Sequence, residues 1–147
     1  MCMMDDADGM VNVLSEARPL AKREHRCSEC GRTIGPGEQY LREAFRWDGE
    51  FQSHKTCKHC EVARNWLSAE CGGWCYGGVE EDVREHCFGH GYGMDLYRLA
   101  VGMAWRWRTP RGRLLPVPAD PHNALADARA LRDALRAASA ARNTNPA

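Results

Sequence analysis

Two Cys-x-x-Cys pairs constrain this chain more than any other feature of its sequence. The first pair is Cys27 and Cys30, the second is Cys57 and Cys60, and a segment long enough for a hairpin separates them. A Cys-x-x-Cys places two sulfur atoms on one tight turn, and two such turns supply the four soft ligands that Zn²⁺ takes in a tetrahedral site. The sequence therefore predicts that these four cysteines bind one zinc ion.

The segment between the pairs predicts a β-hairpin. Residues 38–47 are rich in large aromatic and aliphatic side chains, and residues 50–55 return after Asp48-Gly49. Asp-Gly is a strong hairpin signal because a type I′ turn needs positive φ at both of its central residues. We therefore expect two antiparallel strands joined by a tight turn.

The second cysteine pair is expected to open a helix over residues 57–67. Thr56 is a suitable N-cap, because its hydroxyl can accept a hydrogen bond from a free amide of the first turn. Cys57 and Cys60 would then lie in that first turn. The helix dipole and the free amides favour thiolates there, which suits metal binding.

Knuckle, hairpin and ligand-bearing helix, in this order, resemble a treble-clef zinc finger. Residues 27–32, Cys-Ser-Glu-Cys-Gly-Arg, look like its zinc knuckle, and the resemblance extends over residues 25–68. It implies a structural zinc that is closed to substrate. It also implies a small α+β fold that needs the metal, because a module of about 40 residues buries too little apolar surface by itself. Treble clefs serve many functions, so the resemblance does not define an activity.

His54 allows a second interpretation of the ligands. Cys-x-x-Cys followed by His54-x-x-Cys57 resembles the first half of a LIM domain, in which Cys60 would begin a second site. That pattern needs another cysteine three residues after Cys60, where this chain has Ala63. We therefore expect the four-cysteine set, with His54 in place of Cys60 as the alternative.

A second group of soft ligands follows the first. Its members are Cys71, Cys75, Cys87 and His90, with His86 as a rival ligand. Together they would hold a second zinc, although their spacing is looser than usual. The alternative is that these are ordinary buried cysteines.

The chain divides into four parts in this interpretation. They are a loose acidic arm (1–20), the treble-clef zinc module (21–70), a helical extension with a Trp/Arg segment (71–118), and an Ala-rich C-terminal helix with a tail (119–147). Apolar residues at helical spacing predict a helix over residues 95–108, and residues 80–87 predict a shorter acidic one. The expected core of these C-terminal helices is Trp66, Trp74, Leu96, Leu99, Met103 and Trp107.

Charge is uneven along the chain, although 20 basic residues balance 20 acidic ones. Residues 96–147 hold nine Arg and three Asp, whereas residues 65–95 hold six acidic residues and one Arg. Within the basic part, aromatic and cationic side chains alternate, and such a surface stacks bases and neutralises phosphates. The expected contacts are Trp105, Arg106, Arg108, Arg111 and Arg113. The sequence thus predicts a non-enzymatic zinc protein that binds nucleic acid through this Trp/Arg segment.

Two other functions stay open. In the first, this chain is an adaptor or inhibitor that binds the acidic surface of another protein through the same Trp and Arg side chains. It would then resemble small zinc proteins of bacteria and bacteriophages. Residues 121–131 resemble the last motif of DEDDh 3′–5′ exonucleases, which implies His122 as general base and Asp127 as a metal ligand. The further carboxylates that two metals require do not lie in matching contexts.

The two ends of the chain carry weaker signals. Residues 1–6 lack the basic and apolar regions of a signal peptide, and no stretch approaches the roughly 18 apolar residues of a membrane span. The eight cysteines then fit metal-bound thiolates in a reducing cytoplasm better than disulfides. At the other end, the narrow seam of residues 124–138 suits packing on another helix, either internally or in a homodimer. The seam consists of Ala124, Ala128, Leu131, Leu135 and Ala138.

Overall fold

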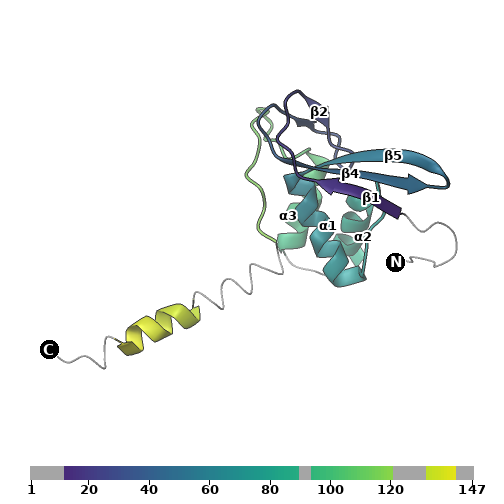
Figure 1. Ribbon diagram of the computed structural model, residues 1–147. Coiled ribbons are helices and arrows are strands. Elements are labelled where there is room, and N and C mark those ends of the chain that lie inside the picture. Colours follow the sequence, from purple (N-terminus) through teal and green to yellow (C-terminus); the bar gives the residue numbers. More distant parts are fainter. Residues whose placement is uncertain (1–11, 90–93, 121–131, 142–147) are drawn as a thin grey trace.

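The protein has an α+β fold in which three helices pack on one side of a small antiparallel sheet (Figure 1). The computed structural model describes residues 12–89, 94–120 and 132–141. The sheet has the order β1-β4-β5 and consists of β1 (Asn12–Ala17), β4 (Tyr40–Trp47) and β5 (Glu50–Cys57). Two short strands, β2 (His25–Arg26) and β3 (Thr33–Ile34), flank the first cysteine pair. The named helices are α1 (Lys58–Cys71), α2 (Val79–Gly89) and α3 (Met94–Ala104).

The hairpin of β4 and β5 confirms the expected turn. Asp48 and Gly49 have φ values of 48° and 80°, which are the two positive angles that a type I′ turn requires. Side chains alternate along β4, so that Leu41 and Phe45 are buried while Arg42 and Arg46 point away from the helices into solvent. The sheet therefore has one face on the core and one face open to solvent.

The expected loose arm is partly a strand. Residues 12–17 form β1, which pairs antiparallel with β4 through a bulge between Val13 and Ser15, whereas residues 1–11 lie outside the described part of the chain. Val13 and Leu14 are about half exposed. Backbone pairing holds this edge strand more than burial does, which is why no clear apolar pattern marks it in the sequence.

Several helix boundaries differ from expectation, and α1 continues to Cys71, beyond its expected end at residue 67. The N-cap of α1 is Cys57 rather than Thr56, whose buried hydroxyl has no hydrogen-bond partner among the residues that the structure describes. Helix α3 ends at Ala104, four residues earlier than expected, because Arg106 and Trp107 have φ values of 54° and 55°. These left-handed angles turn the chain back toward α3 and cost about 1–3 kcal/mol each, so packing must offset them.

Trp107 provides that packing. Its indole is buried against α3, where a Cβ on Gly102 would overlap the ring. Five of the six expected core residues are buried, and Trp74 is half-buried at the edge of the same cluster. The left-handed turn thus places the Trp107 indole beside the four-cysteine cluster described below.

The C-terminal part is described only from residue 132. Residues 132–141 are helical and exposed, and Leu135 has 60% of its surface accessible. Ala124, Ala128 and Leu131 lie outside the described residues, so the homodimer through this seam stays a prediction. Among the helices that the structure describes, none is long and apolar enough to cross a membrane.

Candidate metal centre and the groove beside it

Four sulfur atoms meet where the knuckle faces the start of α1. The Sγ atoms of the two predicted pairs are buried and lie within 4.8 Å of one another, and the Cys30 and Cys57 sulfurs are 4.0 Å apart. In a tetrahedral site with Zn–S bonds of about 2.3 Å, neighbouring sulfurs lie about 3.8 Å apart. The described cysteines form no disulfides. The cluster therefore fits a metal ion with the size and ligand preference of zinc.

Hydrogen bonds shift the thiol pKa values within this cluster. Hydrogen bonding with Cys27, followed by Cys30 and Cys60, holds the pKa of Cys57 far below its usual value, while the same network raises the pKa of Cys60. A hydrogen bond with Cys30 lowers the pKa of Cys27 to about 7. Four thiolates at these distances repel one another, so complete ionisation needs a cation among them. A soft divalent ion satisfies that need.

Donors from outside the cluster also point at the sulfurs. The Cys57 backbone N–H donates to Cys27 Sγ at 3.3 Å, and Trp107 Nε1–H donates to Cys60 Sγ at 3.4 Å. Such bonds disperse thiolate charge and fix ligand orientation. The indole that ends the α3 turn is thus tied directly to a candidate ligand.

His59 makes a second connection between the cluster and the segment after α3. Its Nε2 lies 2.7 Å from the Leu115 carbonyl oxygen, and its Nδ1 lies 3.3 Å from an Arg32 guanidinium nitrogen. These partners make Nε2 the protonated nitrogen and Nδ1 the acceptor. Arg32 in turn pairs with Glu38 at 2.7 Å. Burial raises the pKa of Glu38, but this hydrogen bond and the charge of Arg32 hold it below the usual value.

The structure does not bring His54 to the sulfurs. Its ring lies in β5, 5.2 Å from the Phe45 ring and 4.8 Å from the Tyr76 ring. It therefore packs on the core face of the sheet as an aromatic side chain. The LIM-like ligand set with His54 in place of Cys60 is wrong, because the four cysteines are the residues that converge.

The second group of predicted ligands is only partly assembled. Cys71 Sγ lies 2.6 Å from His86 Nε2, and His86 Nδ1 bonds to the Asp82 carbonyl at 2.8 Å. Cys75 is exposed, and His90 lies outside the described residues. Within the described ranges, the four-cysteine cluster is the one group of three or more candidate ligands. The second zinc stays a prediction.

A buried ion network behind the knuckle was missed in the sequence. Arg64 of α1 donates to Glu43 of β4 at 2.6 Å and to Glu29 of the knuckle at 2.7 Å, and all three side chains are buried. Glu29 also accepts from the Gly77 and Val79 amides at the start of α2, at 3.1 and 3.4 Å. The knuckle is thereby joined to the helical extension. In the sequence, the signal for this network is Glu29 between the first two cysteines, and an isolated glutamate is normally interpreted as an exposed surface charge.

The Trp/Arg segment separates into buried and exposed residues. Trp107 is buried, whereas Trp105 has 60% of its surface accessible and Arg106, Arg111 and Arg113 are exposed. Arg108 is half-buried and bonds to the Gly112 carbonyl at 3.0 Å. The segment therefore offers one indole and three exposed guanidinium groups, with the other indole used in the core.

An apolar groove lies between α3 and the chain that follows it. Its volume is about 550 Å³. One wall is a stripe of exposed side chains along α3 and its turn: Met94, Tyr97, Val101 and Trp105. The other wall contains Pro110, Leu115, Pro116 and Pro118. Arg98 and Arg108 are the charged lining residues. The sequence did not predict this groove, because its prolines read as a linker.

Positive charge gathers outside the knuckle. The Ser28 N–H donates to the Lys55 carbonyl at 2.7 Å, and the Lys55 N–H donates to Ser28 Oγ at 3.1 Å, so Lys55 lies beside the knuckle. Burial and the charges of Lys55 and Arg23 lower the pKa of His25, whose ring lies 5.0 Å from that of Tyr40. Lys55 of β5, His25 of β2 and Arg23 just before β2 thus bring basic groups to one place beside the knuckle.

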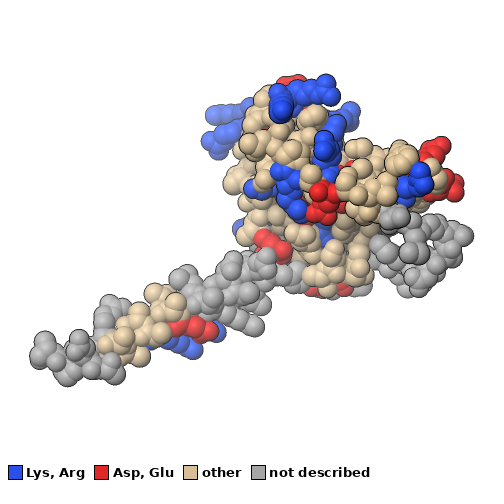
Figure 2. All heavy atoms as spheres, viewed as in Figure 1, with Lys and Arg blue, Asp and Glu red and all other residues tan. Residues whose placement is uncertain are grey.

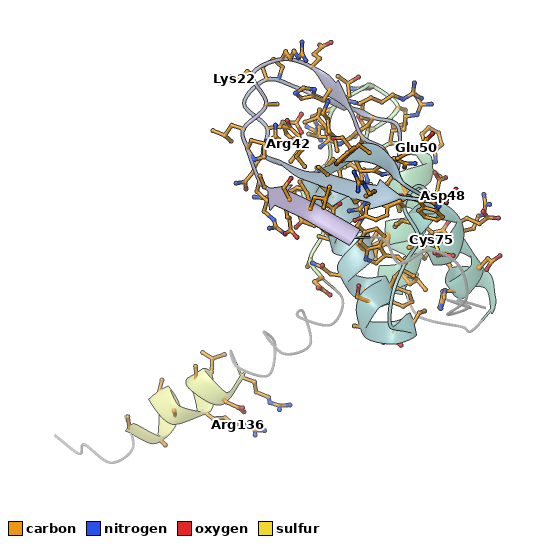
Figure 3. The ribbon with its side chains drawn as sticks, turned by 45° about the vertical axis from the view of Figure 1, so that its right-hand side comes forward. Lys22, Arg42, Asp48, Glu50, Cys75 and Arg136 are labelled. Atoms are coloured by element: carbon orange, nitrogen blue, oxygen red, sulfur yellow. The ribbon has the colours of Figure 1, made fainter. Side chains whose placement is uncertain are left out.

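The opposite end of the sheet is acidic. Figure 2 shows Lys and Arg side chains gathered over β2 and the adjoining end of the sheet, with acidic side chains at the tip of the β4–β5 hairpin. Figure 3 places Lys22 and Arg42 at the first end and Asp48 and Glu50 at the tip. Acidic side chains therefore gather at the hairpin tip, close to Arg46, while the other end of the sheet is mainly basic.

No protein-family model, curated protein or solved structure matches this chain. The fold and the site define its class directly: a small α+β protein whose knuckle and strand–helix segment carry a buried four-cysteine cluster that could hold a metal ion such as zinc. His122 and Asp127 lie outside the described residues, so the exonuclease resemblance stays a prediction.

Proposed function

We propose that this protein is a non-enzymatic zinc protein that uses its apolar groove to bind a segment of another protein. The observation that carries the proposal is the groove itself. Four exposed apolar side chains line one wall, and the other wall is fastened to the cysteine cluster through Trp107 and His59. Monomeric proteins rarely expose a continuous apolar surface without a binding role.

The zinc in this proposal is structural. Four thiolates complete a tetrahedral shell, so no coordination position is left for a substrate. Its contribution is to hold the knuckle, α1 and the segment after α3 in one arrangement. Binding would then use a preformed surface, which lowers the entropy cost of association.

The partner that suits the groove is an acidic amphipathic helix. Met94, Tyr97, Val101 and Trp105 follow one another at intervals of three or four residues, which matches the spacing of anchors on a helix laid alongside. Arg98 and Arg108 at the lining would attract carboxylates flanking those anchors. None of the described lining residues is acidic, so they offer a basic partner no complementary charge.

Nucleic-acid binding by the Trp/Arg segment is the second candidate. The exposed indole of Trp105 and the exposed Arg106, Arg111 and Arg113 favour it. A largely apolar groove contributes little to binding a phosphate backbone, whereas apolar side chains of a protein would fill it. Protein binding is therefore the better supported of the two.

Photo-crosslinking in nuclease-treated lysate of the source cells tests whether the groove binds a protein or the Trp/Arg segment binds nucleic acid. A benzophenone amino acid replaces Tyr97 in the groove, and in a matched control it replaces Trp47, a half-exposed aromatic residue at the hairpin tip. We expect Tyr97 crosslinks that map to one acidic amphipathic segment and are absent from the Trp47 control. Crosslinks at equal yield from both positions, or crosslinks to nucleic acid alone before nuclease treatment, would contradict protein binding.

The variant Trp105→Ala shows how much peptide affinity depends on the groove. The mapped segment, made as a synthetic peptide, should bind this variant about thirtyfold more weakly by calorimetry, because truncating a central Trp costs about 2 kcal/mol or more. Trp47→Ala, which truncates a half-exposed indole at the hairpin tip, is the control and should leave the peptide affinity unchanged. Equal losses in both variants would show that the peptide does not occupy the groove.

A further inference from the structure

We propose that the solvent face of the β1-β4-β5 sheet binds a single strand of nucleic acid, on a surface separate from the groove. The surface consists of Arg42, Arg46, Phe51 and Lys55 and is called the basic sheet face. It does not include the Trp/Arg segment, and the proposal does not depend on what the groove binds.

The register of the sheet puts these four side chains together. Arg42 pairs with Lys55, and Arg46 pairs with Phe51, so each pair lies side by side on one face. The Arg46 guanidinium lies 4.5 Å from the centroid of the Phe51 ring. Like charges directly opposite each other destabilise a sheet, so the Arg42–Lys55 pair has a cost that an anionic ligand would relieve.

Among the described residues, the cations of this face are not paired with acidic side chains, and the exposed acids nearest to Arg46 and Phe51, Asp48 and Glu50, lie beyond them at the hairpin tip. Five glutamates in or near the sheet, the knuckle and α1 are occupied in ion pairs with other arginines: Glu16, Glu29, Glu38, Glu43 and Glu61. Arg42, Arg46 and Lys55 have no ion pair in the part of the chain that the structure describes. The internal pairs thus remove negative charge from the region and leave positive charge outside. Arg23 adds to that charge near β2, since both Arg23 and Lys55 lower the pKa of His25.

The arrangement suits a nucleic-acid strand better than an unstructured polyanion. Arg42 and Arg46 are four residues apart on β4, which corresponds to about 13 Å along the strand. Phe51 is 69% exposed at the end of this row and offers a flat ring next to a cation. Cations along a track with an exposed aromatic ring are the features by which proteins bind single strands without sequence preference.

Fluorescence anisotropy with labelled oligothymidylate tests the proposal in the full-length zinc-loaded protein. The affinity should fall steeply between about 50 and 200 mM salt, and the double variant Arg42→Gln/Lys55→Gln should reduce the slope of log K against log salt by about 1.4, or 0.7 for each lost phosphate contact. The matched control is Arg111→Gln/Arg113→Gln, which removes the same charge from exposed positions of the Trp/Arg segment. We expect its slope to equal that of the unmodified protein.

Phe51→Ala separates stacking from general charge attraction. Loss of one stacked base should weaken oligothymidylate binding about tenfold, while binding of heparin, which has no bases, should not change. Equal binding of heparin and oligothymidylate with no effect of Phe51→Ala would reduce the face to a general polyanion patch and overturn the proposal. A smaller slope of log K against log salt in Arg111→Gln/Arg113→Gln alone would also overturn the proposal, because it would assign nucleic-acid binding to the Trp/Arg segment. The double variant Arg42→Gln/Lys55→Gln should melt at the same temperature as the unmodified protein or higher, because it removes a pair of like charges, so unfolding cannot imitate the expected result.

Discussion

Replacing Cys30 with serine is expected to release the bound metal and unfold the knuckle, the hairpin and the start of α1 together. The four sulfurs come from the knuckle, the end of β5 and the start of α1, so the cluster joins these three parts of the chain. A serine hydroxyl is a poor ligand for Zn²⁺, and structural zinc contributes about 10–16 kcal/mol of apparent binding free energy in small domains. That amount exceeds the total stability of most domains of this size.

Elemental analysis and thermal unfolding measure both parts of this expectation. The unmodified protein should carry one zinc per chain, and Cys30→Ser should carry none and lose its cooperative transition. Cys75→Ser is the matched control, because Cys75 is exposed and lies outside the cluster. A Cys30→Ser protein that kept one equivalent of zinc and an unchanged melting curve would refute the four-cysteine site.

Arg64→Met is expected to lower the free energy of unfolding by about 3–5 kcal/mol, because it leaves two buried carboxylates without their cation. Arg64 bonds to Glu29 and Glu43, and its guanidinium lies 3.9 Å from the centroid of the Trp74 ring. Methionine keeps most of the apolar volume, so the loss reports charge and hydrogen bonding rather than a cavity. Urea unfolding followed by circular dichroism gives the value. The change should appear in the midpoint, with little change in slope.

Two further variants show whether the network causes that loss. Arg46→Met removes an exposed guanidinium and should change stability by less than about 0.5 kcal/mol. Adding Glu29→Gln and Glu43→Gln to Arg64→Met should restore much of the stability, because amides are far less costly to bury unpaired than carboxylates. If the three changes were instead additive and each destabilised further, the network would not act as a unit.

Patterns with a local physical cause were predictable from this sequence. The two cysteine pairs, the Asp48-Gly49 turn and the apolar stripe of α3 each follow from neighbouring residues, and the structure contains all three. The α3 stripe also identified Trp107 as a core residue. In these cases ligand spacing, turn geometry and helical period act over a few residues and need no knowledge of the rest of the fold.

What escaped prediction depends on partners far away in the chain. Arg64 and Glu29 read as surface charges until Glu43 and the start of α2 surround them. The end of α3 depends on the fit of Trp107 against Gly102, which overrides a continuing helical pattern. β1 pairs along an edge with little burial, so its apolar signal is weak. Burial and edge pairing are properties of the assembled chain rather than of any window of sequence.

During protein synthesis, the partners of Glu29 are made one after another. Cys57 follows Cys30 by 27 residues, so a nascent chain can close the metal site before α2 exists. Arg64 follows Glu29 by 35 residues and Val79 follows it by 50. At about 5–20 residues per second, about 3–10 s separate the knuckle from the last of its partners. A ribosome that has made the chain through Cys71 therefore holds all four cysteines and Arg64, but the Gly77 and Val79 amides that bond to the Glu29 carboxylate are still missing until α2 arrives.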